Sequence, residues 1–191
     1  MRRVTGNYVY DVSNPDLVVA FRDYVLVGRI ERYVGTQYTD SPPYHCTNFE
    51  VTILEVIKGN LEAGQVIPIA KNGGISEDKT HVILNGESDF LPEVGGVYIF
   101  IISVCEDKKT LAVYDGYDVV PLEHDITTEL NKIEKSRKRN KQELISKCLA
   151  KSEVFARYVA AAENKNAVEG FSPLIRKIVQ DKERYKSVYE K

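Results

Sequence analysis

The sequence predicts a mainly β chain of the α+β class, in which a closed barrel of five or six strands precedes C-terminal helices. Two observations lead to this assignment. Between Tyr24 and Val120, short stretches rich in β-branched and aromatic residues alternate with turn residues. From Asp125 onward, the apolar residues instead recur at helical spacing. Closure of the sheet is favoured because a barrel leaves no exposed strand edge.

The first of these regions supplies the expected strands, and three of their residues predict how the sheet bends and packs. Gly28 lies inside the first strand and predicts a bend or bulge there. Pro68 places the third strand at an edge or a bulge. The segment 97–105 is almost continuously apolar, so we expect it to be buried on both faces. The expected strands are 24–34, 47–57, 65–70, a short one at 81–84, 97–105, 111–114 and 117–120.

Helices are expected near the N-terminus and throughout the last third of the chain. Asn14 is a good N-cap and Pro15 a good first helical residue. Asn140 and Glu143 have the spacing of a capping box, and an apolar stripe follows. Ser172 and Pro173 repeat the cap signal before a second stripe. The first stripe comprises Leu144, Cys148, Phe155, Tyr158, Val159 and Ala162, and the second Ile175, Ile178, Val179, Tyr185 and Val188.

These elements divide the chain into a barrel domain with a short N-terminal helix, residues 1–124, and a helical extension, residues 125–191. The formal charge differs between the two parts. The first carries 10 Lys and Arg against 18 Asp and Glu, and the second 16 against 10. The two parts are therefore expected to attract each other or partners of opposite charge. The helical stripes need a surface that covers them, which is either the barrel or a second copy of the chain.

Composition excludes several broad classes. With 43% hydrophobic and 28% charged residues, the chain is neither disordered nor fibrous. It contains no run of the roughly 18 apolar residues that a membrane helix needs, so we expect a soluble protein. The residues after Met1-Arg2-Arg3 are too polar for an export signal. The chain as given is thus expected in the cytoplasm, or outside it if such a signal was trimmed.

The three cysteines, Cys46, Cys105 and Cys148, do not form a disulfide framework, because their number is odd and no CxxC spacing occurs. One bridge between Cys46 and Cys105 would join two expected strands. The alternative is a set of reduced thiols in a reducing compartment.

Three segments carry a resemblance to a known group of proteins. The run 49–67 contains a strand, a Lys-Gly turn, a Gly turn and a second strand, and 24–30 and 91–100 complete the pattern. This pattern resembles uncharacterised bacterial proteins, many of them exported, and is distantly similar to the OB barrels of metalloproteinase inhibitors and netrin-like modules. The resemblance implies an OB-like barrel. The inhibitors bind zinc through an N-terminal cysteine, which this chain lacks, so their chemistry is not carried over.

No motif predicts a catalytic residue, a metal site or a cofactor. His45 and Cys46 are adjacent, but consecutive side chains of an extended chain point apart. The spacing of the three histidines, His45, His81 and His124, is not typical of a zinc site. The glycines of 72–74 lack the helix, Lys and Ser or Thr of a phosphate loop. We therefore expect no enzymatic activity, and an uncharacterised enzyme is the third hypothesis.

The leading hypothesis is a module that binds another protein, or secondarily a carbohydrate, through the loops 35–45 and 72–93. Tyr33, Tyr38 and Tyr44 surround the first loop, and tyrosine favours binding surfaces.

The alternative is single-stranded nucleic acid binding through the basic segment 132–141, together with the barrel. Against it, the segment has no aromatic residue and the barrel domain is acidic. The basic residues concerned are Lys132, Lys135, Arg137, Lys138 and Arg139.

Overall fold

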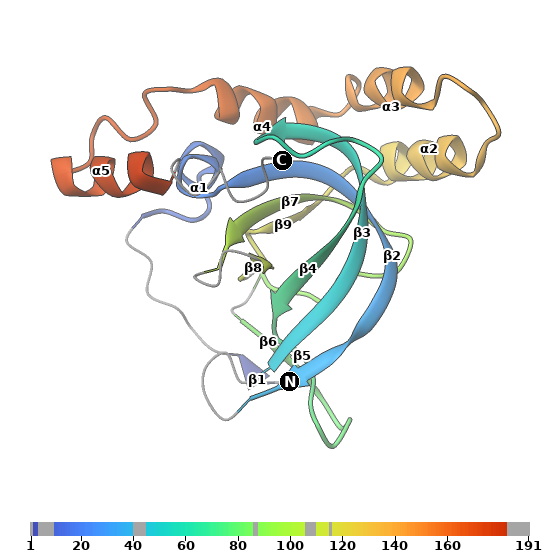
Figure 1. Cartoon of the computed structure of the whole chain (residues 1–191), viewed down its shortest axis with the longest axis horizontal. Coiled ribbons are helices and arrows are strands. Elements are labelled where there is room, and N and C mark those ends of the chain that lie inside the picture. The colour runs from blue at the N-terminus through green and yellow to red at the C-terminus, as the bar shows by residue number, and fades with distance from the viewer. Residues whose placement is uncertain are drawn as a thin grey trace.

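A barrel of five strands forms the centre of the molecule. The computed structural model describes residues 2–3, 10–39, 45–85, 88–105, 110–114 and 116–182, and Figure 1 shows their arrangement. The barrel strands, in order around it, are β2 (Tyr24–Tyr38), β3 (His45–Lys58), β4 (Val66–Asn72), β8 (Leu111–Val113) and β7 (Val97–Val104). β7 pairs back with β2 and closes the barrel.

The barrel is mixed, because β4 and β8 run parallel whereas its other neighbouring strands are antiparallel. A further strand, β9 (Val119–Pro121), pairs with the first half of β7. The long segment 73–96 between β4 and β7, which we call the excursion, forms β5 (Gly74–Ile75) and β6 (Val82–Leu84). The short strand β1 (Arg2–Arg3) pairs with β6, as does β5. The expected closed barrel of five or six strands, followed by C-terminal helices, is confirmed.

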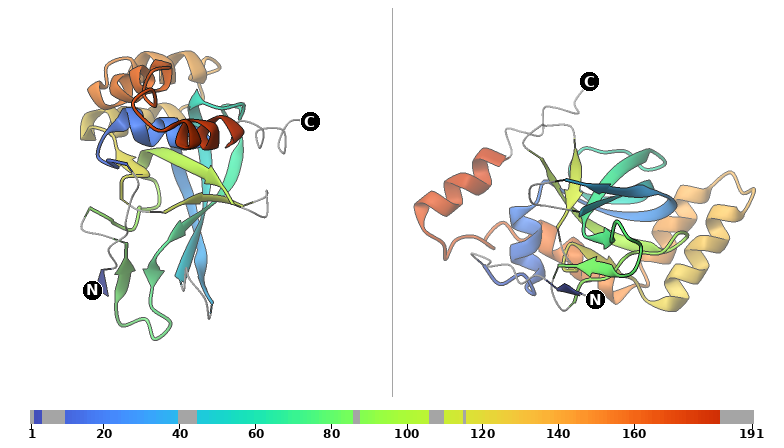
Figure 2. Two further views of the ribbon diagram at one scale, coloured as in Figure 1. Left: turned by 90° about the vertical axis from the view of Figure 1, so that its left-hand side faces the viewer. Right: turned by 90° about the horizontal axis from the view of Figure 1, so that it is seen from below.

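Five helices accompany the barrel, and four of them lie over one end and the adjoining outer face (Figures 1 and 2). These four are α1 (Pro15–Phe21), α2 (His124–Lys135), α3 (Lys141–Leu149) and α4 (Glu153–Glu163), and α5 (Pro173–Lys182) follows them. α1 begins as expected, because the Asn14 side chain accepts a hydrogen bond from the Asp16 N–H at 3.0 Å. No helix in the described part of the chain is long and apolar enough to span a membrane.

Two apolar cores, one inside the barrel and one outside it, share the strands β2 and β7. Successive side chains of a strand point to opposite faces, so each of these strands supplies both cores. The expectation that 97–105 is buried on both faces is confirmed for β7. The interior core includes Tyr24, Leu26, Ile30, Phe49, Val51, Ile53, Ile69, Phe100 and Ile102. The outer core includes Val25, Val27, Ile99, Ile101, Leu130, Ile145, Leu149 and Tyr158.

Gly28 explains how the barrel closes tightly at β2. A Cβ atom at this position would lie 2.4 Å from Cγ1 of Val51 and 3.1 Å from Cδ2 of Phe100. The pairing register also shifts between Val27 and Gly28. The expected irregularity at this glycine is therefore confirmed, and two core side chains leave no room there for a Cβ atom.

The helical tail packs on the barrel. The barrel was one of the two surfaces expected to cover its apolar stripes, the other being a second copy of the chain. Polar contacts support the outer core. The Glu55 carboxylate of β3 accepts hydrogen bonds from Nε2 of Gln142 at 3.3 Å and from Oγ of Ser146 at 2.8 Å. The Glu123 carboxylate accepts bonds from Ser152 Oγ at 2.6 Å and from the Val154 N–H at 3.0 Å. The first residues of α4 are thus held beside the end of β9.

Two local predictions for the tail were wrong. Asn140 is the N-cap of α3, but its side chain makes no capping hydrogen bond, and its backbone, with ψ of 39°, is not in the extended conformation of a typical cap residue. The first apolar stripe belongs to two helices rather than one. Ser152 ends the connection between them by accepting a hydrogen bond from the Phe155 N–H at 2.9 Å. Tyr185 and Val188 of the second stripe lie outside the described residues.

The prediction of a loop at residues 35–45 was also wrong for residues 35–38. Residues 35–38 continue β2 and pair with residues 45–48 of β3. The β-branched and aromatic side chains of Thr36 and Tyr38 suit this extended pairing. The sheet therefore projects well beyond the closed part of the barrel.

We expect Leu130→Ala to lower the free energy of unfolding of the whole chain by about 2–5 kcal/mol, because it leaves a cavity between helix and barrel. Leu130 is fully buried in the outer core, whereas Lys132 on the same helix is exposed. Lys132→Ala is the matched control and should change stability by no more than about 0.5 kcal/mol. Urea unfolding, followed by circular dichroism and tyrosine fluorescence, measures both. Separate transitions for helix and barrel would contradict a shared core.

Candidate functional site

The end of the barrel that lies away from the helices forms a projecting lobe, which we call the distal lobe (Figure 1). It consists of residues 32–38 of β2, residues 45–48 of β3, and the strands β1, β5 and β6. Residues 32–38 extend past the last residue of β2 that pairs with β7, which is Arg29. The lobe therefore presents a ribbon of β2 and β3 beside a small three-stranded sheet, and the β3 side of this ribbon pairs with the end of β4.

A chain of hydroxyl groups joins the ribbon to the start of the small sheet. The Tyr33 hydroxyl lies 2.8 Å from Oγ1 of Thr36, which lies 3.2 Å from Oγ1 of Thr47. The Thr47 hydroxyl donates to the Gly73 carbonyl oxygen at 2.8 Å. Gly74 is required next to it, because a Cβ there would lie 2.0 Å from the Thr47 oxygen and its φ is +145°. The ribbon and the small sheet are thus fixed to each other.

Two of the three tyrosines expected at the site are held on this ribbon. The Tyr38 hydroxyl donates to the Ile75 carbonyl oxygen at 3.0 Å, and its ring meets the His45 ring edge to face at 5.5 Å. The Tyr33 ring packs in the same way on Phe49 at 5.9 Å. Tyr33 and Tyr38 nevertheless remain exposed, with 36% and 40% of the residue surface accessible, respectively. Tyr44 lies outside the described residues.

Apolar exposure is concentrated on the same ribbon. The structure describes five exposed large hydrophobic residues, and three of them, Tyr33, Val34 and Tyr38, lie within residues 32–38. The other two, Val66 and Val94, lie apart from each other in the chain. Sequence reasoning missed Val34, because it assigned this residue to the end of a barrel strand rather than to a projecting ribbon.

The turn between β5 and β6 contains a serine, an aspartate and a histidine, but their hydrogen bonds are those of a turn. The Asp78 carboxylate accepts from Ser76 Oγ at 2.5 Å, from the Thr80 N–H at 3.1 Å and from Thr80 Oγ1 at 2.8 Å. These bonds lower the pKa of Asp78 to about 2. The Ser76 hydroxyl donates to this weakly basic carboxylate and not to the His81 ring, so the arrangement is not that of a serine activated by a histidine.

A buried ion pair attaches the excursion to the barrel. Nζ of Lys71 lies 2.6 Å from Oδ1 of Asp89, and both side chains are fully buried. Lys71 also donates to the Asn72 carbonyl oxygen at 3.0 Å, and Asp89 accepts from the Asn85 N–H at 2.7 Å. Every charged atom of the pair thus has a partner that offsets part of its desolvation. The arrangement indicates a structural role.

The cysteines are free thiols in this structure. Burial, and then the neighbouring charge of Cys105, raise the pKa of Cys46. Burial, followed by the charge of Glu129, raises the pKa of Cys148 to about 11. Cys105 Sγ lies 3.9 Å from the Tyr114 hydroxyl. A raised pKa leaves little thiolate at neutral pH, so Cys46 and Cys148 are poor nucleophiles.

Metal ligation finds no support among the side chains that the structure describes. Within the described ranges, no group of three or more His, Cys, Asp or Glu side chains is placed to hold a metal ion.

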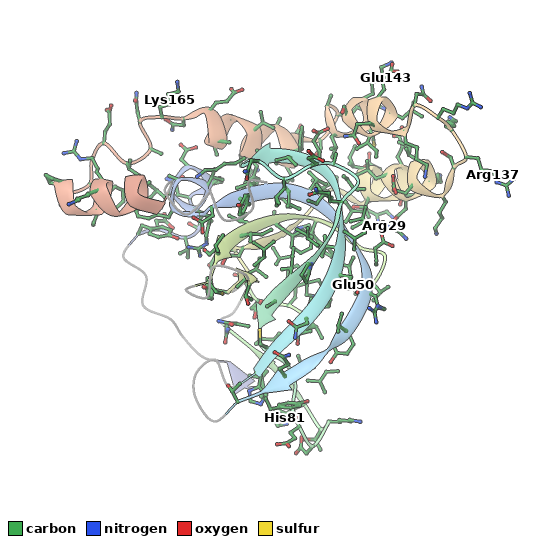
Figure 3. The ribbon with its side chains drawn as sticks, viewed as in Figure 1. Arg29, Glu50, His81, Arg137, Glu143 and Lys165 are labelled. Carbon is green, nitrogen blue, oxygen red and sulfur yellow. The ribbon has the colours of Figure 1, made fainter. Side chains whose placement is uncertain are left out.

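The basic residues expected in the alternative site lie at the other end of the molecule. Lys132 and Lys135 are in the second half of α2, and 137–139 connect α2 to α3. All five are exposed, and none is in an ion pair with another described residue. Figure 3 shows Arg137 beside the helices and His81 at the far end of the distal lobe. The structure therefore does not bring the tyrosines and the basic cluster together.

We expect Thr47→Val to lower the free energy of unfolding by about 1–3 kcal/mol, because it leaves the buried Gly73 carbonyl without its donor. Thr52→Val on the same strand is the control, since the described residues supply no hydrogen-bond partner for that hydroxyl. Urea unfolding compares the two variants. Equal stability of both would mean that the hydroxyl chain does not fix the distal lobe.

The hydrogen bonds of the turn between β5 and β6 should be detectable as a lowered pKa of the Asp78 carboxyl group. Since the pKa of Asp78 is lowered from 3.8, its carboxylate stabilises the turn above that value and loses this effect as the pH falls through about 2. Carbon-detected NMR of the side-chain carboxyl group measures the titration. Thr80→Ala removes one donor and should move the pKa of Asp78 back towards 3.8. An unchanged pKa in that variant would contradict this origin of the shift.

No protein-family model matches the chain, and no curated protein sequence matches it either.

Proposed function

We propose that the chain is a non-enzymatic binding module with an OB-type barrel, and that its distal lobe contacts another protein. One observation carries the proposal: the exposed aromatic and apolar side chains gather on a fixed ribbon at the end of the barrel opposite the helices. Tyr33, Val34 and Tyr38 supply the contact area. Tyrosine suits such a contact, because it combines a large apolar ring with a polar tip.

Rigidity of the ribbon strengthens the proposal. Tyr33 and Tyr38 each have a hydrogen bond from the hydroxyl group and an edge-to-face contact with a neighbouring ring. A side chain that is already held loses little conformational freedom when a partner binds. The free energy of the new contacts is then available for affinity.

A catalytic role is less well supported. The Ser76 hydroxyl donates to a carboxylate, and the thiols of Cys46 and Cys148 have raised pKa values. The carboxylate that accepts from Ser76 is a weak base, since the pKa of Asp78 is lowered to about 2, and a thiol with a raised pKa is mostly protonated at neutral pH.

Single-stranded nucleic acid is the second candidate, favoured by the five exposed cations between Lys132 and Arg139. Nucleic acid grooves combine such cations with aromatic rings on which bases stack. The exposed tyrosines, however, belong to the distal lobe, whose far end His81 marks in Figure 3, whereas Arg137 lies beside the helices. The cations alone would support a contact that depends mainly on salt concentration.

A photo-crosslinking residue placed at Val34 tests the proposal in cells that naturally produce the protein. We expect one protein to be crosslinked from this position. Tyr38→Ser should reduce its yield at least tenfold, since a truncated aromatic anchor costs about 1.4 kcal/mol or more. The control position is Lys165, which is exposed near the helical end (Figure 3).

Equal crosslinking of the same protein from both positions would contradict the assignment to the distal lobe. Binding of a labelled oligonucleotide at low salt, lost on Arg137→Glu but retained in Tyr38→Ser, would instead support the second candidate.

A further inference from the structure

We propose that the partner binds by adding a strand: an extended segment of the partner pairs with the free edge of β2 at residues 32–38, the edge segment. This inference rests on the proposed function and specifies its geometry. The ligand class is therefore a stretch of polypeptide backbone, recognised chiefly by main-chain hydrogen bonds.

The edge segment is the place where the closed barrel opens. One edge of β2 pairs with β3 along almost its whole length, from Val25 to Tyr38. The other edge pairs with β7 only over residues 24–29, followed by hydrogen bonds between Ile30 and the backbone of Gly95 and Gly96. No strand in the described part of the chain pairs with residues 32–38 on that side. Figure 1 shows β2 as the outermost strand there.

Two other barrel strands also have stretches that pair on one side only, because β3 pairs with β4 only up to Thr52 and β4 with β8 only at Ala70 and Lys71. These stretches are less suited to an added strand. The one in β4 contains Pro68, which has no N–H to donate, and the one in β3 is covered by α3, where Gln142 donates to the Leu54 carbonyl oxygen. A row of backbone N–H and C=O groups that is unpaired on one side is a template for another strand. Neither a sugar nor a nucleotide repeats donors and acceptors at the spacing of a strand, roughly 3.3 Å per residue.

Irregularities in β2 define how much of this edge can pair. The register shifts between Ile30 and Arg32 and again between Tyr33 and Gly35, so Glu31 and Val34 are extra residues on β2. Residues 35–38 then pair regularly with 45–48. A bulge twists an edge and limits indiscriminate pairing between copies. The added strand is therefore short, with its backbone bonds centred on residues 35–38.

Side chains at the edge segment add specificity to these bonds. Tyr38 and Val34 are exposed at the two ends of the regular stretch. Arg32 is already engaged by Glu50 at the base of the ribbon. Apolar or aromatic residues at alternate positions of the added strand would pack on the tyrosines, which is the way cross-strand pairs stabilise a sheet.

The test uses linear twelve-residue peptides selected from a phage-displayed random library on the immobilised full chain. For the selected peptides, hydrogen exchange of the full chain should show protection of amides within residues 32–38. Two N-methylated versions of the best peptide, blocked at alternate amides, separate strand addition from side-chain docking. One version should bind at least tenfold more weakly than the parent, and the other should bind within about threefold, since only alternate N–H groups face the edge.

Failure of strand addition and failure of the distal lobe as the contact surface give different results in these experiments. Equal binding of both N-methylated versions, together with loss of binding in Tyr38→Ser, would overturn strand addition and retain the distal lobe as the contact. Unchanged binding in both Tyr33→Ser and Tyr38→Ser would overturn the proposed function. Strand addition is also overturned if no selected peptide protects residues 32–38, or if a second copy of the chain protects them in the absence of peptide.

Discussion

Antiparallel pairing of β2 with β7 holds the barrel closed and organises both apolar cores. It closes the barrel over residues 24–29 and places both strands between two cores. Their inward side chains fill the barrel, and their outward side chains bind the helices. Because the same pairing stops at Arg29, it also determines where β2 becomes an open edge. Closure, docking of the tail and the exposed ribbon thus share one cause.

Polar contacts hold the segments that this pairing leaves at the periphery. Lys58 Nζ donates to the carbonyl oxygens of Val19 and Arg22 at the end of α1, both at 2.8 Å. The Arg22 guanidinium makes two hydrogen bonds of 3.0 Å to the Asp118 carboxylate. Such charged groups, half-buried or buried, are stable only when most of their hydrogen-bonding capacity is satisfied. They fix positions more than they add free energy of folding.

Sequence patterns predicted the parts of this fold that depend on local periodicity. The continuous apolar run of β7 indicated burial on both faces, and Gly28 indicated a tight bend. The patterns failed where distant residues decide the structure. Lys71 and Asp89 form a buried pair across a long excursion, and a lysine in a strand gives no local sign of that partner. Residues 35–38 of the ribbon were expected to belong to a loop, because their polar residues gave no sign of a pairing that Thr47 and Gly73 stabilise from elsewhere in the chain.

Cross-strand nuclear Overhauser effects along β2 are the most direct test of barrel closure by the β2–β7 pairing. We expect contacts between backbone protons of Leu26 and Phe100 and between those of Gly28 and Tyr98. In the isolated chain, residues 35–38 should show such contacts with β3 on one side and with none of the other strands that the structure describes. Absence of the β2–β7 contacts, with the contacts to β3 retained, would mean an open sheet and would rule out barrel closure.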